Sequence, residues 1–283
     1  MQVFNLVISF IGQLLTETPA LAGVSVFFIL WLALWLPIGI PLAAFLSWHP
    51  GKPLTVQQKL PLLASLYLVI PLVFWVVTKA QSIPFSAYGL AWDRGTLTSL
   101  SWGLAVSLLS LIVLFSLEKL LGWMQWQPQE TGRLISVALP MFFLAMWVGG
   151  TEELIFRGFL QTHLQQGYAA GVAAAIGSLI FAFSHMLWEG RAAVPQLPGL
   201  WLMGMVLVLA RWVDAGNLGL AWGLHAGWVW GIVTLDTAAL ITYPPQAPAW
   251  LTGLDQKPLA GFLGLLLMVG TGVGLWVWRS ALP

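Results

Sequence analysis

The chain has 283 residues, of which 59% are hydrophobic and only 7% charged. Because an ordinary soluble domain carries about 25% charged residues, this composition excludes a water-soluble globular protein and indicates a surface that faces lipid. The net charge of +1 gives no support for nucleic acid as a partner, and the absence of cysteine excludes disulfides and thiol chemistry. We therefore expect a multi-pass integral membrane protein whose main partner is the lipid bilayer.

A membrane-spanning helix needs about 20 mostly apolar residues. Stretches of this kind, in chain order, predict about eight spans at residues 21–46, 60–78, 97–121, 134–162, 169–187, 198–212, 217–238 and 259–278. Residues 1–16 are shorter and more mixed, so we expect them to lie at the membrane surface or to be partly embedded. The predicted fold is all-α, with about eight transmembrane helices in one bundle and a single membrane-embedded domain over residues 1–283.

The fourth predicted span contains a charged cluster, Gly149–Arg157, with the sequence GGTEELIFR. Glu153 and Arg157 are four residues apart and can pair on one helical face, whereas Glu152 lies about 100° away on the helical wheel. Thr151 could cap a helix that restarts after the glycine pair. A structural ion pair would explain one glutamate and the arginine. Ionisable side chains at membrane depth are costly, however, and are usually functional.

Two histidines on later spans are candidates to join this cluster. His185 ends an apolar helix, where a lone histidine is more often a hydrogen-bonded or interfacial group. His225 lies well inside the seventh span between small residues, and intramembrane histidines usually face the bundle interior. Three other polar residues are weaker candidates, since we expect them in a loop, at the membrane edge and at a helix end: His49, His163 and Asp236.

Two glutamates and two histidines from three spans form a set suited to hydrolysis. One glutamate would act as the general base that deprotonates a water molecule. The histidines would orient this water and stabilise charge on the substrate's carbonyl oxygen. Alternatively, Glu152, His185 and His225 would hold a zinc ion whose bound water is the nucleophile. Neither an HExxH motif nor a GxSxG motif is present, which excludes the standard zinc-protease helix and the serine nucleophile elbow.

The motifs occur in a recognisable order: Glu-Glu-x-x-x-Arg, then Phe-x-x-x-His, then a third histidine in an Ala- and Gly-rich helix. They comprise Glu152, Glu153, Arg157, Phe181, His185 and His225. This pattern resembles the CPBP family, the CAAX prenyl protease type 2 and bacteriocin-processing (Abi) membrane proteins, with a CPBP-like catalytic core over residues 134–238. The resemblance implies an eight-helix intramembrane endopeptidase. In it the glutamates hold or activate the water, Arg157 stabilises the glutamate helix, and the two histidines complete the site.

The third motif departs from the family pattern. Four residues after the histidine the family commonly has Asn or Asp, but here Val229 stands at that position. Either the N–H of Trp230 or a backbone group replaces the missing amide as an oxyanion donor, or activity is reduced, or the catalytic role has changed.

Three functions remain open on the sequence. The leading hypothesis is an endopeptidase that cleaves a membrane-associated peptide or protein, of which a prenylated CAAX protein is one example. The alternative is a catalytically weak or inactive member that acts as a binding partner or chaperone, which Val229 favours. A transporter with the glutamates as a proton relay is a third hypothesis, but repeated halves typical of transporters are not evident.

Overall fold

The computed structural model describes residues 2–49, 51–52, 54–127 and 131–281. It is almost entirely helical, as predicted, apart from one pair of two-residue strands. The described chain forms two compact units. The first contains the chain up to Tyr88 together with residues 159–173, and the second contains residues 89–158 and the chain from Ala174 onward.

The first unit is built around an aromatic core. Its helices are α1 (Gln2–Thr16), α2 (Ala20–Phe45), α3 (Val56–Leu68), α4 (Ile70–Gln81) and η1 (Phe85–Tyr88). The ring of Phe27 stacks on that of Phe159, with 4.1 Å between the centroids, and Phe74 meets both rings edge-on. Phe27, Phe74 and Phe159 are all buried, so close packing of these aromatic rings holds this part of the chain together.

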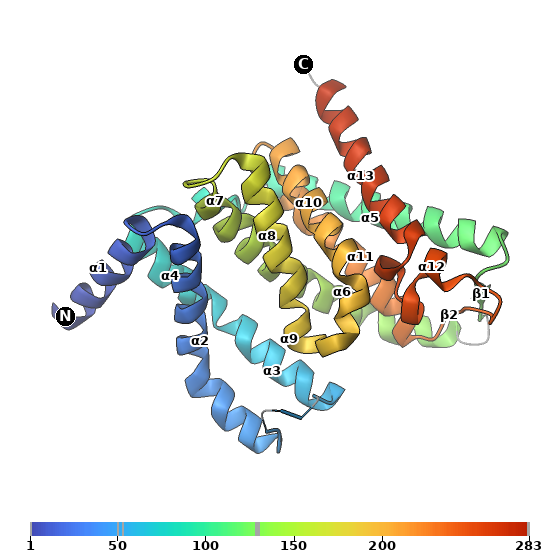
Figure 1. Ribbon diagram of the computed structural model, residues 1–283, viewed down its shortest axis with the longest axis horizontal. Coiled ribbons are helices and arrows are strands. Elements are labelled where there is room, and N and C mark those ends of the chain that lie inside the picture. Colours follow the sequence, from blue (N-terminus) through green and yellow to red (C-terminus); the bar gives the residue numbers. More distant parts are fainter. Residues whose placement is uncertain (1, 50, 53, 128–130, 282–283) are drawn as a thin grey trace. The chain divides into compact units, whose positions relative to one another are not determined.

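The remaining elements, labelled in Figure 1, belong mostly to the second unit. In chain order they are α5 (Arg94–Leu120), β1 (Gln125–Trp126), α6 (Thr131–Glu153), a π-helix (Leu154–Leu160), α7 (Gln161–Leu164), α8 (Ala170–Ser184), α9 (Met186–Glu189), η4 (Gly190–Gln196), α10 (Leu197–Val213), α11 (Gly219–Thr237), β2 (Ile241–Thr242), α12 (Ala249–Thr252), η5 (Leu254–Gln256), η6 (Pro258–Ala260) and α13 (Phe262–Ala281). Helix α7 lies wholly in the first unit, together with the end of the π-helix and the beginning of α8. Strands β1 and β2 pair antiparallel, with Gln125 opposite Thr242.

Helix α11 is the centre of the second unit, where it packs along α5 and α6. Glycines allow the backbones to approach closely. A Cβ atom on Gly223 would lie 2.1 Å from the carbonyl oxygen of Leu100, and one on Gly103 would lie 2.4 Å from that of Leu220. Small residues at such contacts are typical of helix pairs in membranes, because close packing replaces the hydrophobic effect there.

Indole groups of α11 add directed contacts to this packing. Trp222 donates to the carbonyl oxygen of Met146 on α6, and Trp228 donates to the hydroxyl of Ser110 on α5. The two hydrogen bonds are 2.8 and 2.9 Å long. Helix α11 is therefore fixed to both neighbours by main-chain proximity and by directional bonds.

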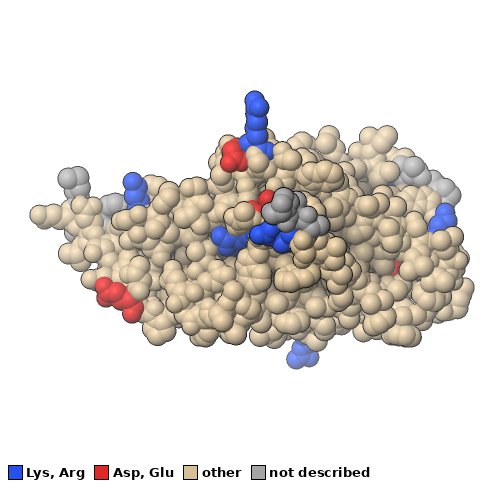
Figure 2. All heavy atoms as spheres, turned by 90° about the horizontal axis from the view of Figure 1, so that it is seen from above, with Lys and Arg blue, Asp and Glu red and all other residues tan. Residues whose placement is uncertain are grey.

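Six helical stretches of the described chain are long and apolar enough to cross a membrane, which confirms a multi-pass integral membrane protein. They are Ala20–Phe45, Gln57–Gln81, Arg94–Leu120, Gly132–Leu164, Ala170–Val213 and Phe262–Ser280. On the face drawn in Figure 2, charged side chains are few and scattered. Large apolar side chains such as Leu109 and Ile112 on α5 are exposed, as a lipid-facing surface requires.

The predicted count of eight spans is not confirmed. The predicted spans 169–187 and 198–212 fall within one apolar helical stretch, Ala170–Val213. The predicted span 217–238 corresponds to α11, which is not among the six. Its glycines, tryptophans, His225 and Asp236 lower its mean hydropathy. Most of its first three turns are buried, so these residues pack against protein and need not be as apolar as a lipid-facing helix.

Candidate functional site

The two glutamates end helix α6, and a π-helical turn follows them directly. The helix is continuous through Gly149 and Gly150, so the expectation that it restarts at Thr151 is wrong. The glycines serve packing instead. A Cβ on Gly149 would lie 3.3 Å from the Cα of Ala226, and one on Gly150 would lie 2.7 Å from the ring of Trp222. The close approach of α6 to α11 brings the glutamates next to His225, and π-turns are frequent at functional sites.

Glu153 is the central side chain of the cluster. One of its carboxylate oxygens, Oε1, accepts hydrogen bonds from Arg157 Nη1 at 2.8 Å and from His225 Nδ1 at 2.7 Å. All three side chains are at most 2% exposed. Because Arg157 can only donate, Oε1 is an acceptor, and the Nδ1 atom of His225 that shares this oxygen carries the proton. The predicted Glu153–Arg157 pair is therefore present, and it also fixes the imidazole of His225.

Glu152 lies on the other side of the same imidazole. Its Oε2 atom is 3.6 Å from His225 Nε2, and its side chain is 12% exposed, whereas that of Glu153 is fully buried. The distance is longer than a direct hydrogen bond, so a water molecule beside the pair can contact both groups. The two neighbouring carboxylates thus have different surroundings. Glu153 is enclosed by charged partners, and Glu152 keeps access to solvent or substrate.

Phe181 connects the second histidine to this group. Its ring meets His185 edge-on at 4.8 Å and His225 edge-on at 5.7 Å, and the guanidinium of Arg157 lies 4.2 Å above its centre. His185 stands where α8 ends and α9 begins, and its Nδ1 lies 3.0 Å from the carbonyl oxygen of Phe181. All five predicted site residues thus lie in the second unit. Four of them contact one another directly, and His185 is linked to them through Phe181.

The weaker candidates lie elsewhere. His49 and Asp236 are exposed, as predicted. His163 is not at a surface, because its side chain is buried in the first unit and its ring stacks on Phe159 with 5.3 Å between the centroids. Its neighbours Gln161 and Gln165 suggested a polar environment, but Gln161 is buried as well.

Val229 is half-buried, one turn beyond His225. The adjacent Trp230 donates its indole N–H to the carbonyl oxygen of Ala138, at 2.8 Å. This N–H is therefore already used to fix α11 to α6. The expectation that Trp230 replaces the missing amide does not agree with this arrangement.

Glu152, His185 and His225 are the candidate ligands for a zinc ion. Zinc sites use three or four nitrogen, oxygen or sulfur ligands close together. Among the residues that the structure describes, no three or more His, Asp or Glu side chains are grouped so that they could hold a metal ion. The candidate metal ligands Glu152, His185 and His225 therefore do not fit a zinc site in this arrangement.

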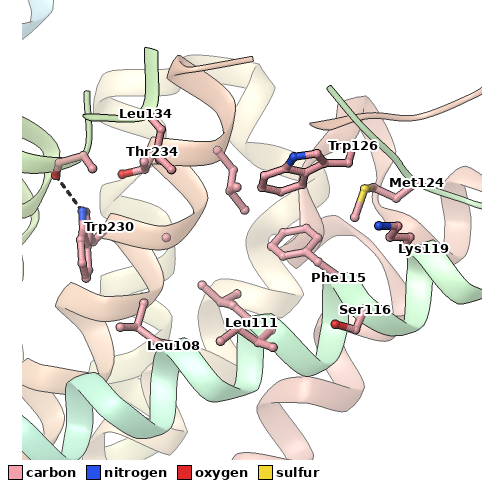
Figure 3. A pocket seen from close by; sticks show the side chains of 14 residues that line it. Leu108, Leu111, Phe115, Ser116, Lys119, Met124, Trp126, Leu134, Trp230 and Thr234 are labelled. Carbon is pink, nitrogen blue, oxygen red and sulfur yellow. Dashed lines mark hydrogen bonds between the residues drawn. The ribbon is translucent and has the colours of Figure 1, made fainter. Parts of the chain in front are cut away.

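An apolar cavity of about 590 Å³ lies further along α11 (Figure 3). Its walls come from α5, α6 and α11 and from the segment around β1. They include Leu108, Leu111, Phe115, Trp126, Trp230 and Gly231. Trp230 and Gly231 follow His225 by about one and a half helical turns. Among the lining residues that the structure describes, Lys119 is the one with a charged side chain.

Arg211, in the last turn of α10, contacts the segment that carries the site, and the sequence did not predict this contact. The side chain is buried, and its Nη1 donates to the carbonyl oxygen of Arg157. The sequence pattern suggested only a charged residue at the end of a short span. A useful signal was available, because an arginine inside an apolar stretch is costly unless the protein supplies acceptors.

The turn between α10 and α11 is anchored to the start of α5. Asp214 accepts hydrogen bonds from Ser99 Oγ at 2.7 Å and from the backbone N–H of Leu220 at 3.3 Å. Burial raises the pKa of Asp214, and these hydrogen bonds act in the opposite direction. Asn217 donates to Thr96 Oγ1. The start of the helix that carries His225 is therefore fixed by side-chain contacts.

Comparison with known proteins adds independent information on the region that contains this site. No curated protein and no solved structure matches the chain. Residues 134–231 match the family model described as type II CAAX prenyl endopeptidase Rce1-like, which confirms the resemblance to the CPBP family.

Proposed function

We propose that the protein is an intramembrane endopeptidase in which Glu152 activates a water molecule for attack on a peptide bond. The main support is the contact pattern of one imidazole: His225 Nδ1 lies 2.7 Å from Glu153 and His225 Nε2 lies 3.6 Å from Glu152. Since Nδ1 carries the proton, Nε2 is an acceptor. A water that donates one hydrogen to Glu152 and the other to Nε2 would point its oxygen lone pairs outward.

The reaction would proceed by general base catalysis. Glu152 takes a proton from the water as its oxygen attacks the carbonyl carbon, which gives a tetrahedral intermediate with a negative oxygen. His185 holds its Nδ1 against the carbonyl oxygen of Phe181, so its protonated form would present Nε2–H as a donor to this oxyanion. The proton held by Glu152 then passes to the leaving nitrogen as the C–N bond breaks.

Glu153 and Arg157 would serve this chemistry indirectly. Glu153 selects the tautomer of His225 and holds the ring in place, much as a buried carboxylate does in other hydrolytic sites. Arg157 neutralises Glu153 and rests on Phe181. A metal ion is not part of this proposal, since the donor set does not fit one.

The substrate would be a membrane-associated peptide or protein. The apolar cavity beside α11 would accept an apolar chain attached to such a substrate, and the name of the matched family, CAAX prenyl endopeptidase, suggests a prenyl chain as one case. The expected product is a shortened, still membrane-bound peptide and a released fragment.

The test is a cleavage assay in nanodiscs with a panel of membrane-anchored peptides, both prenylated and unmodified. Wild type should cleave at least one peptide, and a strong chelator should leave the rate unchanged. Glu152→Gln should lower kcat by about 10³-fold or more, since the base is lost. Glu17→Gln, which changes an exposed glutamate, is the matched control. Equal cleavage by wild type and Glu152→Gln would refute the mechanism.

The alternative function, an inactive binding partner or chaperone, is supported by Val229 and by the engaged N–H of Trp230. It predicts that wild type cleaves none of the peptides but retains one of them. Photo-crosslinking of the same peptide panel distinguishes the two functions, because a bound and uncleaved peptide supports the alternative and a cleaved peptide refutes it.

A further inference from the structure

Arg211 joins two segments that carry the candidate site. Its Nη1 donates to the carbonyl oxygen of Arg157 and lies 3.5 Å from that of Gly158, both within the π-turn after the glutamates. Its Nε donates to the carbonyl oxygen of Gly216, at 3.1 Å. One guanidinium thus connects the turn that follows Glu153 with the turn that precedes α11.

The two connected segments determine where the reacting groups lie. The π-turn sets the position of Arg157, whose side chain binds Glu153. The Gly216 turn leads within three residues to the start of α11, which carries His225. A π-helix is rare and occurs mostly as a single turn inside an α-helix, so we expect this turn to depend on its surroundings to persist. Donors from outside the helix, directed at its carbonyl oxygens, are suited to stabilise it.

The arginine side chain is suited to bind carbonyl oxygens of both turns. Its planar group presents donors in a fixed fork, so one side chain can serve acceptors on two different segments. Lysine carries the same charge on a single ammonium and does not reproduce the fork. Glu153 lies within electrostatic range of Arg211, so the positive guanidinium also attracts the carboxylate that orients His225.

We propose that Arg211 is a positioning residue that keeps the glutamates and His225 in register by holding the π-turn to the α10–α11 turn. This inference rests on the proposed peptidase function for its effect on catalysis. It also makes a claim about the His225 ring that holds whether or not the protein cleaves peptides.

The experiment compares Arg211→Lys and Arg211→Met with two matched controls, Arg279→Lys and Arg279→Met. Arg279 is an exposed arginine in the last turn of another membrane-spanning helix, α13. With a peptide that wild type cleaves, both Arg211 variants should lose about 100-fold in kcat, as expected for a displacement of about 1 Å. The KM should stay within about threefold. Both Arg279 variants should behave as wild type.

A second measurement reads the His225 ring directly. Nitrogen NMR of histidine-labelled protein, with the His225 signal assigned from a His225→Gln sample, should show displaced imidazole signals in the Arg211 variants only. Wild-type kcat together with an unchanged His225 signal in the Arg211 variants would overturn the inference. A wild-type kcat in Arg211→Lys alone would also overturn it, because charge without the fork would then suffice.

The two readouts separate this inference from the proposed function. If wild type cleaves no peptide, the peptidase proposal fails and the His225 signal alone decides the role of Arg211. If Arg211→Met does not fold, Arg211→Lys, which keeps the charge, carries the test.

Discussion

The two halves of α11 differ in how they meet their neighbours. The first half, Gly219–Gly227, packs so closely on α5 that a single methyl group on Gly223 would collide with backbone. The second half borders a cavity of about 590 Å³. We call the first half, which carries the imidazole of His225, the tight half. The second half, which lies beside the apolar cavity, is the loose half. One helix can thus hold a reacting group rigidly and leave room for a ligand a turn further on.

The largest expected effect on stability and cleavage is at Glu153, whose carboxylate binds His225 in the tight half of α11. Glu153→Gln would leave the fully buried Arg157 without its counter-charge, and breaking such a pair typically costs about 3–5 kcal/mol. We expect this loss in the free energy of unfolding in detergent, and a fall of at least about 100-fold in cleavage by the folded fraction, because His225 loses its orienting carboxylate. Glu17→Gln should change neither. An unfolding free energy within about 0.5 kcal/mol of wild type would contradict the role assigned to Glu153.

A smaller effect on the free energy of unfolding should distinguish the packing of the two halves of α11. Gly223→Ala should lower the free energy of unfolding by about 1–3 kcal/mol, since the new Cβ would lie 2.1 Å from the backbone oxygen of Leu100. Gly231→Ala is the matched change in the loose half. Its Cβ would meet only side-chain atoms, those of Leu111 at 2.5 Å and of Leu108 at 3.8 Å, and both leucines border the cavity.

Thermal unfolding of both alanine variants in the same detergent checks this difference. The comparison between the halves would be wrong if Gly231→Ala were the more destabilised of the two.

The cavity itself can be tested by filling it. Leu108→Trp adds a large ring to a wall of the cavity and should raise the KM for a peptide with an attached apolar chain about tenfold, which corresponds to about 1.4 kcal/mol. The kcat should be unchanged, because the reacting groups lie in the other half of α11. The neighbouring Leu109→Trp, at an exposed position, is the control. Equal KM values for the two variants would show that the cavity does not bind substrate.

The smallest effect is expected at the junction of the two halves. Val229→Asn introduces an amide where the family commonly has one and should raise kcat by about tenfold or less, since an oxyanion donor acts only when its geometry is right. Val233→Asn, one turn further along α11, should leave the rate unchanged. A fall in kcat for Val229→Asn would indicate that another donor already occupies this place.

Much of this arrangement could be predicted from local patterns. The i, i+4 spacing indicated the Glu153–Arg157 pair, and the low charge content indicated the membrane. The motif order indicated that His185 and His225 accompany the glutamates. These features depend on helical periodicity and on the cost of charge in lipid, both of which are properties of short segments.

Other features depend on contacts between distant segments and were not predictable in the same way. The glycine pair before the glutamates suggested a helix break, but it serves packing against Ala226 and Trp222. Arg211 looked like the end of a span, because two of its acceptors, the carbonyl oxygens of Arg157 and Gly158, lie more than fifty residues earlier in the chain. His163 is buried by packing within the first unit, which its polar neighbours in the sequence do not indicate. The count of eight spans is not confirmed, because α11 is less apolar than the six stretches that are long and apolar enough to cross a membrane.

The modest apolarity of α11 also bears on how the protein is inserted into the bilayer during synthesis. A segment rich in Gly, with a histidine at its centre, gains little from transfer into lipid on its own. Helices α5 and α6 precede it in the chain and are already available as partners. We therefore expect α11 to enter the bilayer together with them, so that a change on α5 such as Gly103→Leu would impair the insertion of a segment synthesised more than one hundred residues later.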